Sequence, residues 1–263
     1  MSTTTNKKKR RQSKLDAGIS PYWTWAIYAD SGAGKTTLAA TAPKPMFLDS
    51  NQGLLSILGR PGFEHVRRTP VTNWRQLEEA YDNFSGTGQH DWTKFQTIVF
   101  DHFDDIQGLI LDELTEQAAQ RDPRRMLDET QQREWGIMLN RLRRIMRKFK
   151  ALPMHKILIF AAAVNNETGK LEPSLSGKLR NQLPYFCDMI GYLRIGKGGK
   201  RILSFDERST RYLAKCRPWW WTADDRRIIV PDVADDPKFL THLFESIAAG
   251  PKGATVNRGT NKE

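Results

Sequence analysis

The chain of 263 residues is long enough for one α/β domain with additions. Its 41 lysines and arginines outnumber its 30 aspartates and glutamates, and the net charge of +11 favours a polyanionic partner, although basic charge also improves solubility. Cys187 and Cys216 do not have the spacing of a metal site, so a reducing cytoplasm is expected. No apolar run reaches the roughly 20 residues of a membrane span, and the N-terminus lacks a signal-peptide core. We therefore expect a cytoplasmic protein that does not enter a membrane.

The first 20 residues form a polar segment in which lysine and arginine cluster between Lys7 and Lys14. This composition is typical of a disordered tail. Contact with nucleic acid is a further interpretation of the cluster, and a nuclear localisation signal has the same composition. We therefore expect a basic disordered tail at 1–20, one domain at 21–249 and a second disordered tail at 250–263.

A glycine-rich loop lies between a short apolar strand at 23–28 and a helix that begins at Thr36. This order forms a P-loop, in which backbone N–H groups and the helix dipole face a nucleotide phosphate. Lys35 is expected to face solvent in the empty loop and to reach the β- and γ-phosphates, and the Thr36 hydroxyl is expected to hold Mg²⁺. Ala29 departs from the pattern, because glycine is usual at that position. The residues predicted to bind the nucleotide are Asp30, Ser31, Gly32, Ala33, Gly34, Lys35, Thr36 and Thr37.

Two further apolar strands end in polar residues that could complete the site. The strand that ends at Asp49 continues into a polar turn with Asn51, and we expect it to lie beside the P-loop strand, with Asn51 near the γ-phosphate. The strand at 95–101 ends in Asp101, at the Walker B position, where a carboxylate orients Mg²⁺ through water. Asp101 could also cap the helix that follows.

The rest of the chain alternates charged, helical and apolar segments. Asn73 is predicted to cap a helix that begins at Trp74, and residues 113–134 are charged. An amphipathic helix with a basic outer face is predicted from about residue 131 to 152. The remaining predicted elements are a strand at 156–163, a polar loop at 164–183, short strands at 189–195, 201–205 and 211–214, a hairpin turn at 196–199 and a helix at 237–248.

The order of these motifs resembles the phage-encoded RecA-like ATPases of the Sak-type single-strand annealing group, also described as phage nucleotide-binding AAA-type proteins. The resemblance covers about residues 22–248, and its most specific pieces are 29–37, 47–53, 97–101, 175–179 and 214–217. It implies an α/β fold with a RecA-like P-loop NTPase core: a mostly parallel central sheet, flanking helices and C-terminal antiparallel hairpin strands. It also implies ATP and Mg²⁺ as cofactors, single-stranded DNA as partner, a homo-oligomeric filament or ring, a single-strand-binding protein as a candidate partner, and the cytoplasm of a bacterial host.

The resemblance also assigns residues. Segments 114–130 and 164–182 correspond to two loops that face single-stranded DNA in RecA-like filaments. Lys215 and Arg217 resemble a Lys-x-Arg pair that reaches the γ-phosphate of the neighbouring subunit, although an edge-strand surface pair would have the same spacing. The candidate DNA-binding residues are Arg121, Arg124, Arg125, Lys170, Lys178 and Arg180.

Two positions depart from the RecA-like pattern. Asn51 stands where those proteins carry a glutamate that activates the attacking water, and Asp49 is a substitute base on the same side of the strand. Ala162 and Ala163 stand where a polar γ-phosphate sensor is usual, with Asn165 nearby. These departures predict slow hydrolysis.

Three functions therefore compete. The leading hypothesis is an ATP-binding, single-stranded-DNA-binding protein of phage DNA recombination or annealing, with slow, DNA-stimulated ATP hydrolysis. In it, Trp219 or Trp220 could stack on bases, although core or subunit interface is the simpler interpretation of these rings. The alternatives are a small-molecule P-loop kinase with an arginine-rich lid at 121–125, and a non-hydrolysing DNA-binding protein that nucleotide stabilises as an oligomer.

Overall fold

The computed structural model describes residues 22–122, 124–126, 129–222 and 224–250. The predicted tail at 1–20, and the predicted tail at 250–263 beyond its first residue, lie outside the described residues.

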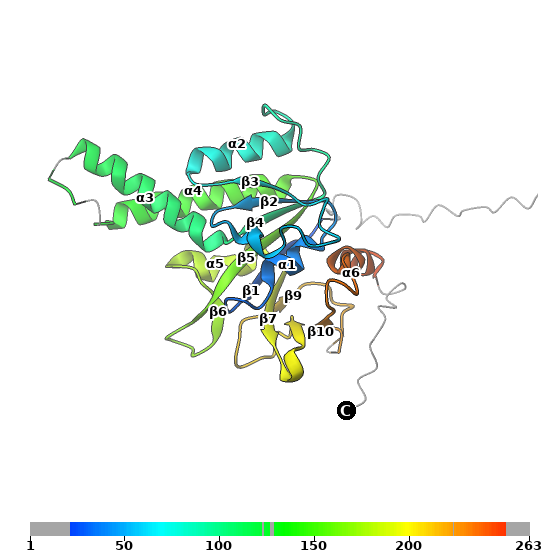
Figure 1. Cartoon of the computed structure of the whole chain (residues 1–263). Coiled ribbons are helices and arrows are strands. Elements are labelled where there is room, and N and C mark those ends of the chain that lie inside the picture. The colour runs from blue at the N-terminus through cyan, green and yellow to red at the C-terminus, as the bar shows by residue number, and fades with distance from the viewer. Residues whose placement is uncertain (1–21, 123, 127–128, 223, 251–263) are drawn as a thin grey trace, which may run out of the picture.

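The described part of the chain forms one ten-stranded sheet with helices on both faces (Figure 1). The strand order is β10-β8-β7-β1-β5-β4-β2-β3, with β6 added to β5 and β9 added to β7. The strands are β1 (Thr24–Ala29), β2 (Pro45–Asp49), β3 (Arg67–Pro70), β4 (Thr97–Asp101), β5 (His155–Val164), β6 (Leu171–Pro173), β7 (Met189–Ile195), β8 (Arg201–Ser204), β9 (Lys215–Cys216) and β10 (Arg227–Val230). The helices are α1 (Lys35–Ala40), α2 (Trp74–Ser85), α3 (Phe103–Arg121), α4 (Gln132–Ala151), α5 (Lys178–Phe186) and α6 (Phe239–Ala248), with short 3₁₀ turns η1 (Gly53–Ser56) and η2 (Lys197–Gly199).

Strands β7, β1, β5, β4, β2 and β3 run parallel, whereas β6, β8, β9 and β10 pair antiparallel. The predicted α/β fold, with a mostly parallel central sheet and antiparallel C-terminal strands, is therefore confirmed. The central strands read as unbroken apolar runs because helices cover both faces of a parallel sheet.

Alternate residues of β1 separate two cores. Ala26 and Tyr28 join the core under α2, α3, α4 and α5, and Trp25 and Ile27 join the core under α1 and α6. The pleat sends successive side chains to opposite faces, so one short strand anchors both layers. Because β1, β4 and β2 run in the same direction in the sheet, their carboxyl ends lie along one edge, where parallel α/β folds bind ligands.

The expected position of β2 is wrong in one respect. β2 pairs with β3 and β4, and both β4 and β5 separate it from β1. The polar turn after β2 therefore reaches the P-loop region across the end of β4 and not from a strand beside β1.

Four segments fold differently from the sequence-based predictions. The segment expected to be a DNA-facing loop at 114–130 begins with eight helical residues, because α3 continues to Arg121. The predicted loop at 164–183 contains the end of β5, strand β6 and the first residues of α5. The strand predicted at 211–214 lies instead at Lys215–Cys216, and the strand Arg227–Val230 was not predicted.

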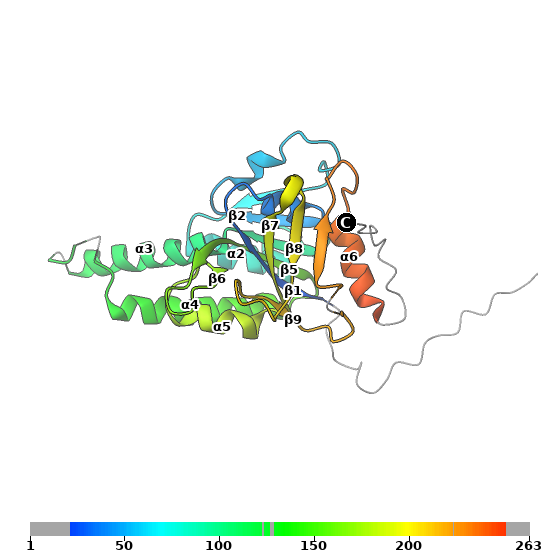
Figure 2. The same cartoon turned by 90° about the horizontal axis from the view of Figure 1, so that it is seen from below.

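Helices α3 and α4 pair as a long hairpin that projects away from the sheet, as Figures 1 and 2 both show. α4 begins with a capping box, in which Gln131 and Glu134 satisfy each other's backbone N–H groups. Met138, Leu142, Ile145 and Phe149 follow at spacings of three and four and are buried against the sheet. The predicted Asn73 cap is also confirmed, because its side chain accepts a hydrogen bond from the Gln76 backbone at 2.9 Å.

Candidate nucleotide-binding site

The loop between β1 and α1 has backbone conformations that favour glycine at two positions. Gly32 has φ 77° and Gly34 has φ 93°, in the left-handed region. Ala29 is the last residue of β1 and is not among the described residues with positive φ, so alanine fits at this departure from the glycine pattern. The loop therefore has the strand–loop–helix form of a P-loop.

Lys35 folds back into the loop that it follows. Its Nζ donates hydrogen bonds to the carbonyls of Ala29 at 3.0 Å and Asp30 at 3.1 Å. The side chain is buried, so the expectation that Lys35 faces solvent in the empty loop is wrong. Burial lowers the pKa of Lys35, and the carboxylates of Asp104, Asp101 and Asp30 oppose that shift. The loop carbonyls thus hold the ammonium where a phosphate could replace them.

Thr36 and Asp101 meet at the end of β4. The Thr36 hydroxyl donates to Asp101 Oδ1 at 3.3 Å, and Asp101 Oδ2 is buried with no hydrogen-bond partner among the described residues. Burial raises the pKa of Asp101 to about 6; the charge of Asp49 adds to this shift, and His102, Thr36 and Lys35 oppose it. A hydroxyl beside a carboxylate with a free oxygen suits Mg²⁺.

The described residues hold no group of three or more His, Cys, Asp or Glu side chains that could bind a metal by themselves. Mg²⁺ does not require such a group, because it is usually bound through one or two protein ligands together with phosphates and water. Asp101 does not cap α3, because His102 occupies the cap position.

Asp49 is buried and engaged through both carboxylate oxygens. Oδ2 pairs with Arg68 at 3.0 Å, and Oδ1 accepts a hydrogen bond from the Gly53 backbone at 3.2 Å. Arg68, which the sequence analysis missed, therefore ties β3 to the end of β2.

Asn51 is exposed, and Gly53 brings it close to Asp101. A Cβ atom on Gly53 would lie 2.7 Å from Asp101 Oδ2 and 3.1 Å from Asn51 Oδ1. The absence of a side chain at Gly53 thus lets the two groups flank one point. This role of Gly53 was not predicted, although a glycine two residues after the polar Asn51 could have suggested it.

His102 follows Asp101 and was also not singled out. It has φ 63°, an uncommon backbone conformation for a residue other than glycine. Its ring nitrogens lie 4.0 Å from Asp101 Oδ1 and 3.8 Å from Asp104 Oδ1. Ser50 closes this corner by donating to the Asp101 carbonyl at 2.8 Å.

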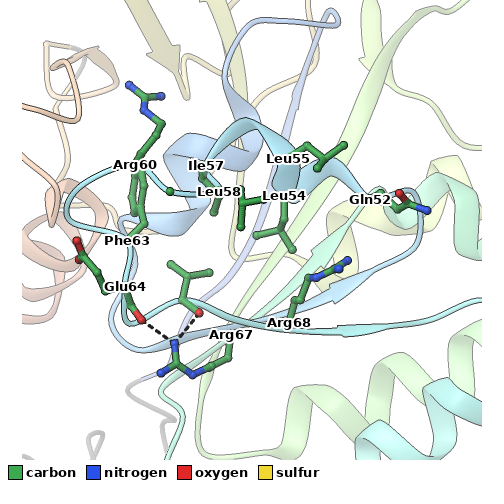
Figure 3. A pocket seen from close by; sticks show the side chains of 12 residues that line it. Gln52, Leu54, Leu55, Ile57, Leu58, Arg60, Phe63, Glu64, Arg67 and Arg68 are labelled. Atoms are coloured by element: carbon green, nitrogen blue, oxygen red, sulfur yellow. Dashed lines mark hydrogen bonds between the residues drawn. The ribbon is translucent and has the colours of Figure 1, made fainter.

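Residues between Gln52 and Arg68, the segment that follows Asn51 in the chain, line an apolar pocket of about 360 Å³ (Figure 3). Its wall includes Leu54, Ile57 and Phe63, and arginine side chains lie at its margin. Because Arg68 belongs to both the pocket and the Asp49 ion pair, the pocket borders the predicted catalytic turn.

The predicted DNA-binding residues divide between separate projections. Arg121 and Arg124 are exposed at the tip of the α3–α4 hairpin. Arg125 forms a bidentate pair with Glu134, at 3.0 and 2.7 Å, and this pair lowers the pKa of Glu134 to about 2. Since only 12% of the Arg125 side chain is exposed, its guanidinium serves the fold.

The other predicted DNA-binding residues follow β5. Lys170 lies in the turn of the β5–β6 hairpin, and Lys178 is exposed at the start of α5. Arg180 is half-buried and donates from Nε to the Leu175 carbonyl at 3.1 Å. Lys178 is therefore the most accessible cation of this segment, and Lys170, although half-buried like Arg180, has no side-chain hydrogen bond among the described residues.

Lys215 and Arg217 lie near the amino-terminal ends of the parallel strands, whereas the P-loop follows the carboxyl end of β1. β9 pairs with the first residues of β7, and β7 runs parallel to β1. Lys215 Nζ donates to the carbonyls of Pro184 and Cys187, and burial lowers the pKa of Lys215. Arg217 pairs with Asp188 at 2.6 Å. The pair could reach a nucleotide only in another copy of the chain.

Two other predictions concern aromatic residues and the kinase lid. Trp219 is 78% exposed, whereas Trp221 is buried against Phe205. Arg121, Arg124 and Arg125 lie at the far end of α3, whose 19 residues span about 28 Å at 1.5 Å per residue from the Asp101 end. An arginine-rich lid over the phosphates is therefore wrong for these residues.

Comparison with known proteins agrees with this geometry. The family described as an AAA domain matches residues 22–217, which include the P-loop, Asp49, Asn51 and Asp101. No curated protein matches the chain. Among the described residues, no helix is long and apolar enough to cross a membrane.

Proposed function

The chain belongs to the AAA domain family, whose core is a P-loop ATPase fold, and from this premise we propose that it binds ATP with Mg²⁺ and single-stranded DNA in recombination or annealing. The observation that carries the nucleotide part is the contact between Thr36 and Asp101 beside the glycine-rich loop. Mg²⁺, when bound, neutralises phosphate charge. The chain's own residues would orient the triphosphate through the loop N–H groups and Lys35.

The DNA part rests on four exposed or half-exposed cations at the α3–α4 tip, the β5–β6 turn and the start of α5: Arg121, Arg124, Lys170 and Lys178. Among the described residues, none of the four forms an ion pair with a carboxylate. The net charge of +11 supports the same assignment. In this proposal the protein assembles as a homo-oligomer on the strand, with ATP setting the assembled state and phage DNA as substrate.

A non-hydrolysing, nucleotide-stabilised DNA binder is the second candidate. It is favoured by Asn51, whose amide cannot accept a proton from water, and by Asp49, whose carboxylate is already engaged. ATP turnover measured with and without single-stranded DNA separates the candidates. DNA-stimulated turnover supports the first, and nucleotide binding without turnover supports the second.

The nucleotide site is tested by Lys35→Ala. ATP affinity should fall strongly, because alanine removes the charge that faces the phosphates. The circular dichroism spectrum should remain that of the native fold. Unchanged ATP affinity in this variant would remove the assignment of the loop.

The DNA surface is tested by salt dependence. If six phosphates are engaged, log K should fall with log salt at a slope of about −4, from about −0.7 per phosphate for single strands. The combined replacement of Arg121, Arg124, Lys170 and Lys178 by alanine should flatten the slope, whereas Arg75→Ala on α2 should not. A slope near zero in the unaltered protein would exclude a nucleic-acid partner.

A further inference from the structure

The hairpin between β7 and β8 carries a cluster of unpaired cations. Arg194, Lys197, Lys200 and Arg201 fall within eight residues that contain no acid. Among the described residues, none of the four forms an ion pair, whereas Arg68, Arg125 and Arg217 each do. Unpaired cations held together in a short turn repel each other and favour an anionic ligand.

This hairpin lies against the P-loop. β7 runs parallel to β1 with Tyr28 opposite Tyr192, so both strands end at the same edge of the sheet. The turn then returns Arg201, the first residue of β8, to the loop. Arg201 Nε donates a hydrogen bond to the Ala33 carbonyl at 3.2 Å.

Arg201 occupies the space that a side chain at position 34 would take. A Cβ atom on Gly34 would lie 2.9 Å from Arg201 Nε and 3.5 Å from its Cδ and Cζ. The guanidinium is thus placed within van der Waals distance of the residue that precedes Lys35. Glycine at position 34 therefore leaves space for the Arg201 side chain and also allows the left-handed backbone conformation.

The terminal nitrogens of Arg201 remain available. Only Nε has a hydrogen-bond partner among the described residues, so both terminal amino groups are without one. A guanidinium presents its donors in a planar fork that matches two phosphate oxygens. The Nε bond to Ala33 fixes the plane of that fork beside the loop.

We propose that Arg201 binds the phosphates of the nucleotide held by the P-loop of the same chain, so that the β7–β8 hairpin forms an additional wall of the site. This inference rests on the proposed nucleotide-binding function. The ligand is a nucleoside di- or triphosphate, and the competing role is that of a strut that only holds the Ala33 carbonyl.

Two substitutions separate the roles. Arg201→Gln keeps a nitrogen donor at the same number of bonds from the backbone as Nε, so the bond to Ala33 can persist while the charge is lost. Arg201→Lys keeps the charge. Measured by titration calorimetry with ATP and ADP, Arg201→Gln should weaken affinity at least about tenfold, the usual effect of a lost charge-assisted hydrogen bond, and Arg201→Lys should recover part of it.

Lys197→Gln, at the exposed tip of the same hairpin, is the matched control and should leave both affinities within about twofold. Wild-type affinity in Arg201→Gln would overturn the inference and leave Arg201 only the structural role of holding the Ala33 carbonyl. An equal loss in Lys197→Gln would overturn it as well, because the effect would then belong to the overall charge of the hairpin. Failure of the unaltered protein to bind nucleotide, or no effect of Lys35→Ala, would instead remove the proposed function.

Discussion

Asn51 presents an amide where the RecA-like pattern of the sequence analysis would have a glutamate, and Gly53 leaves this amide close to Asp101. A carboxylate could accept a proton from water, and general-base catalysis contributes about 10²- to 10⁴-fold. Asn51→Glu should therefore raise ATP turnover at least several-fold without tighter ATP binding, as steady-state assays with matched binding titrations would measure.

Asp49→Asn is the comparison for this prediction. Because both oxygens of Asp49 hold the turn through Arg68 and Gly53, we expect this variant to lower thermal stability. If Asn51→Glu is inert while Asp49→Asn abolishes turnover in a folded protein, the base is Asp49.

Gly34 and Gly32 provide a matched pair at the P-loop. Both have left-handed backbone conformations, but a Cβ on Gly32 would meet nothing within 4 Å, whereas one on Gly34 would collide with Arg201. Alanine strains the backbone at either position, and only Gly34→Ala also displaces the arginine. ATP affinity should fall further in Gly34→Ala than in Gly32→Ala, and equal losses would show that the backbone alone matters.

At the scale of elements, His155 joins the start of β5 to α6. Its ring stacks on Phe244 with centroids 4.4 Å apart, and its Nδ1 accepts a hydrogen bond from the Trp23 backbone at 3.2 Å. Burial, with a smaller effect of Lys156, lowers the pKa of His155 to about 4. The neutral ring is therefore the form that the fold accommodates.

Acid should weaken the fold through this residue. Between about pH 6.5 and pH 4 the unfolded chain protonates His155 while the folded chain does not, so stability falls as the pH is lowered through this window. Urea unfolding at several pH values should show a shallower dependence in His155→Asn, which keeps an acceptor near the Trp23 backbone. An identical dependence in the two proteins would assign the acid sensitivity to other groups.

The predicted end of the helix after Asp101 was the largest error in the secondary structure. Residues 113–134 were interpreted as a charged segment and 114–130 as a loop, but the buried stripe of Phe103, Ile106, Ile110 and Leu114 continues the helix α3 to Arg121. Charge does not prevent a helix whose apolar stripe packs on a neighbour, and α3 packs on α4 and β5. The β5–β6 hairpin was missed because β6 has three residues, too few for a periodic pattern.

At the scale of the whole molecule, the parts of the site that are contiguous in sequence were predictable. The P-loop and the strand that ends in Asp101 carry their signal within a few residues. The contacts that complete the site join distant segments: Arg201 is 168 residues from Ala33, and Arg68 is 19 residues from Asp49. The position of β5 between β1 and β4 likewise depends on pairing between segments far apart in the chain, which no local pattern encodes.

The opposite placement of Arg217 and the P-loop gives a prediction about assembly. Arg217→Ala should leave ATP binding intact and lower turnover, and mixing it with Lys35→Ala subunits should restore some activity if Arg217 acts on a neighbour's nucleotide. Asp188→Asn is the control, because it breaks the ion pair and keeps the arginine. If Asp188→Asn reproduces the defect and no mixture recovers, the pair is a structural contact of the sheet edge.

The α3–α4 hairpin has a mechanical consequence. α3 starts one residue after His102, beside Asp101, and its 19 residues carry the chain about 28 Å to the tip. A tilt of about 5° at the base would displace the far end by roughly 2.5 Å, close to the length of a hydrogen bond. If the hairpin tilted in this way, a small movement at its base would therefore be magnified at Arg121.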